Sequence, residues 1–124
     1  MRVLFACVLM LGAAATPKDP DRDELRAMEA KIDKRIGAAS CEENAECRAA
    51  PFGAKPCGGP WSYKVYSTRN TDVAALLREI ETYRSRNAEL NRKNRLESDC
   101  RLVEAPAVRC QEGRCSTGVP VAPE

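Results

Sequence analysis

The sequence contains no histidine among its 124 residues. Without that side chain, neither a Ser-His-Asp nor a Cys-His catalytic arrangement can be built, and the commonest metal ligand is missing. No Cys-x-x-Cys redox motif occurs, and no glycine-rich loop carries the Lys-Ser/Thr ending of a phosphate-binding loop. Asp and Glu are frequent, but none stands in a context that predicts a raised pKa. We therefore expect no enzymatic activity, no catalytic residue, no cofactor and no metal site.

Aromatic residues are also scarce, at 5% of the chain, and no basic block is interleaved with them. The formal net charge is only +2. Nucleic-acid binding normally requires a concentrated basic surface, so we expect no nucleic-acid partner. A short chain with few aromatic residues buries little apolar surface, and covalent cross-links should matter for its stability.

The longest apolar run, residues 3–12, is too short for a membrane-spanning helix, which needs roughly 20 apolar residues. It follows Met1-Arg2 and precedes three small residues, 13–15, which is the layout of a secretory signal peptide. The segment before Cys7 resembles a lipidation motif, but too few residues precede it. We expect removal of residues 1–15, no transmembrane segment afterwards, and a periplasmic or secreted protein.

Of the seven cysteines, Cys7 lies inside the predicted signal peptide, and the other six are Cys41, Cys47, Cys57, Cys100, Cys110 and Cys115. In a small exported domain six cysteines predict three disulfides, although they allow 15 connectivities and the spacing does not choose among them. A bridge across the widest gap, Cys57 to Cys100, would stabilise the domain by about 4 kcal/mol. Zinc binding by four cysteines is the less favoured alternative.

Two amphipathic helices are predicted, at about residues 20–36 and 71–92. Asp19 is a good N-cap for the first and Gly37 a good C-terminal stop. Its apolar stripe should pack on the core; the stripe consists of Leu25, Met28, Ile32 and Ile36. For the second helix we expect Asn70 or Thr71 as the N-cap. Its apolar face comprises Val73, Leu76, Leu77, Ile80 and Tyr83, with Leu90 as an extension. Residues 91–95 carry three positive charges and indicate either a solvated, frayed helix end or a contact with phosphate or an acidic partner.

The only tryptophan follows a turn rich in glycine and proline, within residues 55–67. Alternation predicts a strand at about 61–67, in which Trp61, Tyr63, Val65 and Ser67 share the core face, while Tyr66 lies on the other face, beneath a helix. Further short strands are expected at about 101–104, 107–111 and 114–117. A turn at Glu112-Gly113 would set Cys110 opposite Cys115. The two cysteines then either bridge each other or fasten the hairpin to Cys41, Cys47 or Cys57.

These elements define an α+β class, a small disulfide-stabilised domain in which two helices pack with a short antiparallel sheet. A leader and helix would occupy residues 16–40, the cross-linked domain 41–117, and a flexible tail 118–124. The motif Cys57-Gly-Gly-Pro-Trp-Ser-Tyr, with Tyr66-Ser67, Ser98-Asp99-Cys100 and the final cysteine pair, resembles a pattern of cysteine-rich exported bacterial proteins. The resemblance covers residues 41–115 and implies export and a disulfide framework, but no activity.

The function predicted from these features is non-catalytic: an exported binding or interaction protein for a protein or small ligand that the sequence does not identify. The alternative is a secreted protease inhibitor. In that case the loop between Cys47 and Cys57 would be held rigid and present Phe52 or Lys55 to a protease. Nothing in the sequence predicts the oligomeric state.

Overall fold

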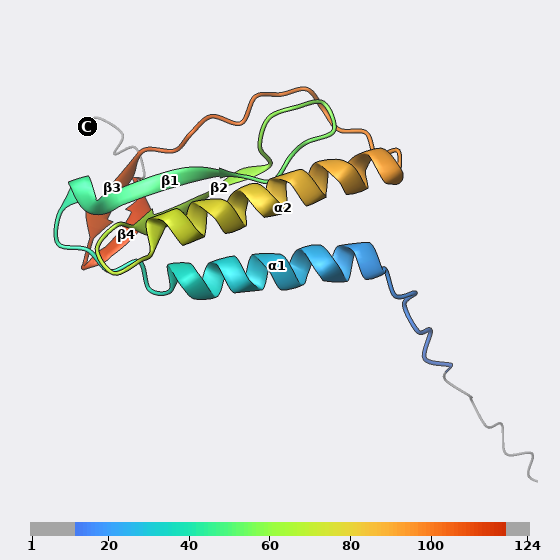
Figure 1. Ribbon diagram of the computed structural model, residues 1–124, viewed down its shortest axis with the longest axis horizontal. Coiled ribbons are helices and arrows are strands. Elements are labelled where there is room, and N and C mark those ends of the chain that lie inside the picture. The colour runs from blue at the N-terminus through green and yellow to red at the C-terminus, as the bar shows by residue number, and fades with distance from the viewer. Residues whose placement is uncertain (1–11, 119–124) are drawn as a thin grey trace, which may run out of the picture.

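The structure, a computed structural model, describes residues 12–118 (Figure 1). The predicted signal peptide, 1–15, and the predicted flexible tail, 118–124, therefore lie almost wholly outside the described residues. Within them the chain forms two α-helices, a short 3₁₀ helix, η1 (Asn44–Glu46), and four strands. Neither of these α-helices has the length and apolarity needed to cross a bilayer. The α+β class is confirmed.

Helix α1 (Pro20–Ile36) has the predicted bounds because both of its ends are capped as the sequence indicates. The Asp19 carboxylate accepts a hydrogen bond from the backbone N–H of Arg22 at 3.2 Å. At the other end Gly37 has a positive φ of 58°, and its N–H donates to the carbonyl of Asp33 at 2.9 Å. Ile32 is buried, and the rest of the predicted stripe packs against the core.

Helix α2 (Val73–Lys93) starts later than predicted. Its N-cap is Asp72 rather than Asn70 or Thr71, since the Asp72 carboxylate accepts from the N–H of Ala75 at 3.0 Å. The predicted apolar face is correct except at Leu77, which is 43% exposed. The buried stripe runs along one narrow side of the helix, and Leu77 lies beyond its edge. The stripe comprises Leu76, Ile80, Tyr83 and Leu90, joined by Asn87 and Asn91.

The strands form two separate antiparallel sheets of two strands each, not the single sheet predicted. Strand β1 (Cys47–Phe52) pairs with β2 (Ser62–Ser67), and β3 (Val108–Gln111) pairs with β4 (Arg114–Thr117). The strand predicted at 114–117 is confirmed with its bounds, and those predicted at 61–67 and 107–111 each begin one residue later.

Strand β1 corrects the prediction of a loop between Cys47 and Cys57, because residues up to Phe52 are paired in the sheet. A proline is tolerated in a two-stranded ribbon where its missing N–H faces away from the partner strand; Pro51 lies opposite Tyr63 in the register. Conversely, residues 101–104, predicted as a strand, have no regular secondary structure. A side chain takes the place of a partner strand there, because the Tyr63 hydroxyl donates to the carbonyl of Val103 at 3.1 Å.

The two helices run antiparallel and cover one face of the β1–β2 sheet (Figure 1), with α1 against β2 and α2 against β1. The core lies between these layers. The rings of Phe52 and Tyr83 stack there with centroids 4.2 Å apart. The buried cluster consists of Ile32, Ala50, Phe52, Tyr66, Leu76, Ile80 and Tyr83.

The prediction for β2 is confirmed at Tyr66, which lies beneath the helices, and is wrong at Trp61, which was predicted for the core face. Tyr66 is buried in the core cluster, whereas Trp61 is 47% exposed. Lys64 lies on the same side of the strand as Tyr66 and faces α1. Its ammonium reaches Glu29 and Asp33 of α1 at 2.7 and 2.8 Å, so the charge is paired while the stem covers apolar surface.

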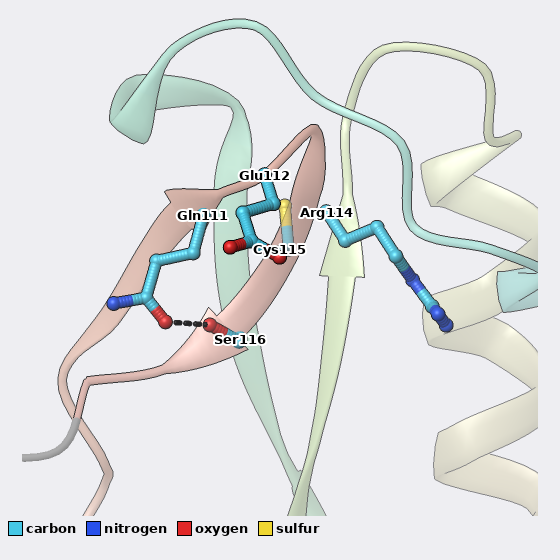
Figure 2. A pocket seen from close by; sticks show the side chains of 5 residues that line it. All are labelled: Gln111, Glu112, Arg114, Cys115 and Ser116. Atoms are coloured by element: carbon cyan, nitrogen blue, oxygen red, sulfur yellow. Dashed lines mark hydrogen bonds between the residues drawn. The ribbon is translucent and has the colours of Figure 1, made fainter.

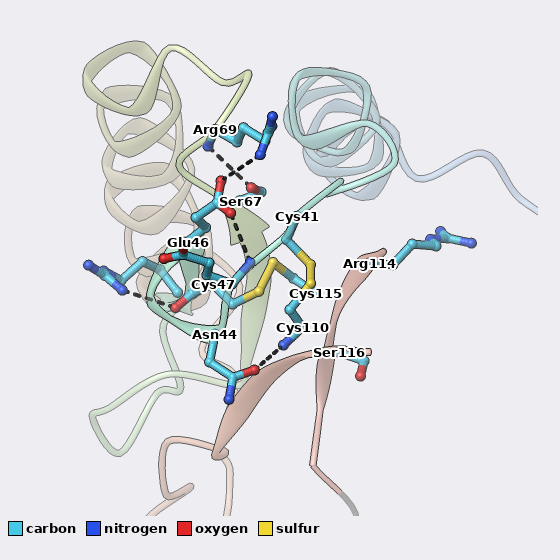
Figure 3. Close-up of a disulfide and its surroundings, with 12 residues drawn as sticks. Cys41, Asn44, Glu46, Cys47, Ser67, Arg69, Cys110, Arg114, Cys115 and Ser116 are labelled. Carbon is cyan, nitrogen blue, oxygen red and sulfur yellow. Dashed lines mark hydrogen bonds and ion pairs between the residues drawn. A yellow bond between two sulfur atoms is a disulfide. The ribbon is translucent and has the colours of Figure 1, made fainter. Parts of the chain in front are cut away.

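Three disulfides are present, as predicted: Cys41–Cys110, Cys47–Cys115 and Cys57–Cys100. Cys110 and Cys115 face each other across the β3–β4 hairpin, but the direct bridge between them is not formed. Instead the two fasten the hairpin to Cys41 and Cys47, one of the arrangements left open by the sequence (Figure 3). The sulfurs of Cys41, Cys47 and Cys115 lie within 4.8 Å of one another. The Cys47–Cys115 bridge joins the two sheets, and the adjacent Cys41–Cys110 bridge joins the hairpin to the segment before η1.

Candidate binding surface

The loop between β1 and β2, residues 53–61, is the most heavily restrained irregular segment of the domain. Two hydrogen bonds close it internally, from Lys55 N–H to the Gly59 carbonyl at 2.8 Å and from Gly58 N–H to the Lys55 carbonyl at 2.9 Å. Gly53 enters it with φ of 77°, and a Cβ there would come within 3.0 Å of the Trp61 ring. Only glycine fits that position without displacing the tryptophan. We call this segment the 53–61 loop.

Two asparagines of α2 hold the loop by its main chain. The N–H of Ala54 donates to Asn87 Oδ1 at 2.8 Å, and Asn91 Nδ2 donates to the Ala54 carbonyl at 2.7 Å. Both asparagines are buried. Sequence reasoning missed them, although Asn87 and Asn91 continue the spacing of the apolar stripe, a position where a polar side chain requires a partner. That spacing is the signal that would have revealed them.

Lys55 fastens the other side of the loop. Its buried ammonium donates to the Asp99 carboxylate and to the Arg101 carbonyl, the latter at 2.8 Å. It also lies 5.7 Å from the centre of the Trp61 ring, within cation–π range. The hydrogen bond from Lys55, followed by one from the Arg101 N–H, lowers the pKa of Asp99. The lysine side chain therefore joins the loop to the segment around residues 99–101.

The Cys57–Cys100 disulfide reinforces this connection on the exposed side of the loop. The Cys57 N–H also donates to Ser98 Oγ at 3.3 Å. The loop is thus restrained by its own hydrogen bonds, by α2, by an ion pair and by a covalent bridge. Trp61 emerges from this rigid frame with nearly half of its surface accessible.

Phe52 and Lys55, the two residues predicted to be presented to a protease, are each only 5% exposed. Phe52 belongs to the core, and Lys55 is occupied by the contacts described above. An inhibitory side chain must enter the protease's pocket, and neither residue is available for that in this conformation. The large accessible apolar side chains near this loop are instead Trp61, Leu96 and, on the segment that Lys55 and Tyr63 contact, Leu102 at 80% exposure.

The largest hollow in the described part of the chain, about 720 Å³, lies beside the β3–β4 hairpin (Figure 2). The Ser116 hydroxyl donates to Gln111 Oε1 at 2.8 Å, which satisfies two of the polar groups that line it. Arg114 points away from the other lining side chains and donates to the Ala38 carbonyl at 3.3 Å. The hollow thus brings together no set of polar groups converging on a ligand, and we do not take it as the functional site.

Comparison of the chain with protein-family models, with curated proteins and with solved structures gave no match. The structure itself defines a small α+β domain held by three disulfides, with a rigid loop that exposes a tryptophan. The resemblance to cysteine-rich exported bacterial proteins stays a prediction.

Proposed function

We propose that the protein is an exported, non-catalytic binding protein that contacts a protein partner through Trp61 and the 53–61 loop. Export is supported by the signal-like beginning of the sequence and by the three disulfides, which persist in oxidising compartments such as the periplasm or the extracellular space. The observation that carries the binding proposal is the exposure of Trp61 at 47% on a fixed loop.

Tryptophan is among the residues that most often dominate the energy of protein interfaces, because it buries a large area with little loss of side-chain freedom. A loop that is already rigid loses little conformational entropy when it binds. The 53–61 loop meets both conditions, since its glycines, α2 and the Cys57–Cys100 bridge fix its course before any partner arrives. Leu102 supplies further apolar surface on the adjoining segment.

The test is a capture experiment from envelope extract and culture medium with three folded, oxidised proteins: wild type, Trp61→Ala and Leu77→Ala. Leu77 is the matched control, because it is a similarly exposed apolar residue on α2, outside the loop. We expect one partner to be retained by wild type and Leu77→Ala and lost with Trp61→Ala. Reduced protein should lose it as well. Retention by all three oxidised proteins, or by none, would contradict the proposal.

Protease inhibition stays an alternative prediction, but Phe52 and Lys55, the two residues predicted to enter the protease's pocket, are buried. A panel of trypsin-like and chymotrypsin-like proteases addresses it directly. Inhibition at micromolar protein that survives Trp61→Ala would favour this alternative over the binding function proposed above.

A further inference from the structure

A second feature lies where residues 55–56 of the same loop meet the last turns of α2. A pocket of about 280 Å³ opens between them, just below the usual size range of sites for drug-sized ligands. Its charged lining residues are Lys55, Arg92 and Arg95, with Asn91 and Leu96 between them. No carboxylate lines it. A volume of this size admits a small ion or one charged group of a larger molecule.

The two arginines of the pocket are not used in the ion pairs of the described residues. Among residues 12–118, the basic side chains of α2 that pair with carboxylates are Arg84, Arg86 and Lys93. Lys55 is paired with Asp99, which offsets one charge and fixes the ammonium in place. The guanidinium groups of Arg92 and Arg95 are therefore the free positive charges of the pocket.

Helix α2 ends in an ordered hydrogen-bonded cap, not the frayed end that the polar run 91–95 suggested. The Leu96 N–H donates to the Asn91 carbonyl at 3.0 Å, and the Arg95 N–H donates to the Arg92 carbonyl at 3.3 Å. This pair of bonds is the Schellman arrangement, which satisfies the terminal carbonyls of the helix. Basic residues near a helix C-terminus often serve only to offset its negative dipole end. Here those carbonyls are already bonded, and the side chains remain available.

Arg95 occupies the position of that cap where proteins most often place glycine. Its φ is 51°, in the left-handed region that disfavours residues with a Cβ. A strained non-glycine residue beside a pocket is an observation from which a functional role can be inferred. Glycine at this position would avoid the backbone strain but would lack the charged side chain that arginine places beside the pocket.

We infer that this pocket binds an oxyanion, a carboxylate or a phosphate group, through the guanidinium groups of Arg92 and Arg95. Arginine presents paired N–H donors whose geometry matches both kinds of group. Lys55 also lines the pocket, but its charge is paired with Asp99, so the two arginines supply the net positive charge. The site is independent of the contact proposed for Trp61, and either can fail without the other.

Titration with inorganic phosphate and, separately, with succinate at constant ionic strength tests the inference. Trp61 is the only tryptophan and lies 5.7 Å from the Lys55 ammonium, so its fluorescence reports on the pocket. Amide NMR shifts of residues 92–96 provide the second readout. We expect saturable binding of at least one probe, and the probe that binds more tightly distinguishes a phosphate from a carboxylate site. A response that stays linear for both would overturn the inference.

The deciding variant is Arg95→Gly, because it removes the charge and relieves the strained backbone together. We expect the Kd to rise about tenfold or more, as for loss of a charge-assisted hydrogen bond, while the Tm stays equal or increases. Arg92→Gln should weaken binding similarly. Arg84→Gln removes the same charge from an exposed, paired site on α2 and should change the Kd less than about twofold. Equal weakening by all three variants, or a lower Tm for Arg95→Gly, would refute the assignment.

Discussion

Replacement of both Cys57 and Cys100 by serine should lower the free energy of unfolding by about 3 kcal/mol. The two residues are 43 apart in the sequence, and a single bridge over that distance would be worth about 4 kcal/mol. The Cys47–Cys115 bridge, with a separation of 68, encloses them. In the unfolded oxidised chain this bridge therefore connects Cys57 and Cys100 by a second, shorter route through the chain, of about 25 residues.

The two routes in parallel, one of 43 residues and one of about 25, constrain the unfolded chain like a single loop of about 16 residues. A bridge that closes a loop of this length stabilises the fold by about 3 kcal/mol, which is less than the value of about 4 kcal/mol for an isolated bridge. Both cysteines are exposed, so serine leaves no cavity. Urea unfolding under non-reducing conditions measures the loss, and the m-value should rise because the unfolded chain expands. Ser98→Ala is the control. It removes the hydrogen bond to Cys57 but keeps the bridge, and should cost less than about 1 kcal/mol. A loss below about 1 kcal/mol for the double variant, with an unchanged m-value, would refute the reasoning.

Three further predictions concern the core, the loop and the helix pair. In urea unfolding, Phe52→Ala should lower the free energy of unfolding by about 3–5 kcal/mol and Trp61→Ala by less than about 1.5 kcal/mol, because only Phe52 is a core side chain. Equal losses would contradict the assignment of strand faces. Asn87→Leu should lower the free energy of unfolding by about 1–3 kcal/mol and speed amide exchange in the 53–61 loop, because the Ala54 N–H would lose its acceptor. An unchanged exchange rate would contradict this role of Asn87. The hydrogen bond from Arg35 lowers the pKa of Glu79 to about 2 from 4.5, so the pair stabilises the fold above pH 4.5 and this contribution disappears as the pH falls toward 2. Glu79→Gln should therefore be less stable than wild type at pH 7, by about 0.5–1 kcal/mol, and equal to it near pH 2; a gap independent of pH would exclude the ion pair as its source.

The parts of the fold that follow from local chemistry could be predicted from the sequence. Asp19, Pro20 and Gly37 define α1 because capping depends on neighbouring residues only. The number of disulfides follows from an even count of cysteines. Their connectivity depends on which segments meet in space, so the sequence left Cys110 with several partners, of which Cys41 is the one observed.

The error at Trp61 arises because a strand pattern does not say which face the helices will cover. Alternation places Trp61 and Tyr66 on opposite sides of β2, and the prediction assigned the core face to the side of Trp61. The ion pairs that Lys64 makes with α1 are long-range and leave no trace in the local sequence. For the same reason the sequence pattern predicts Trp61, which is exposed, as a core residue. It also predicts only a turn before Trp61, where the structure has the restrained 53–61 loop.

The way in which Asn87 and Asn91 contact the loop has a consequence for the variation that this domain can accept. Asn87 and Asn91 form hydrogen bonds with the backbone N–H and carbonyl of residue 54, and neither bond involves the side chain of that residue. The helix therefore holds the peptide groups of residue 54 whatever side chain stands there, in addition to the restraints from Gly53, Lys55 and Cys57. Exchange of Ala54 or Pro56 for other residues should alter the contact surface and leave the backbone path unchanged, so a family of binding specificities can be built on one scaffold.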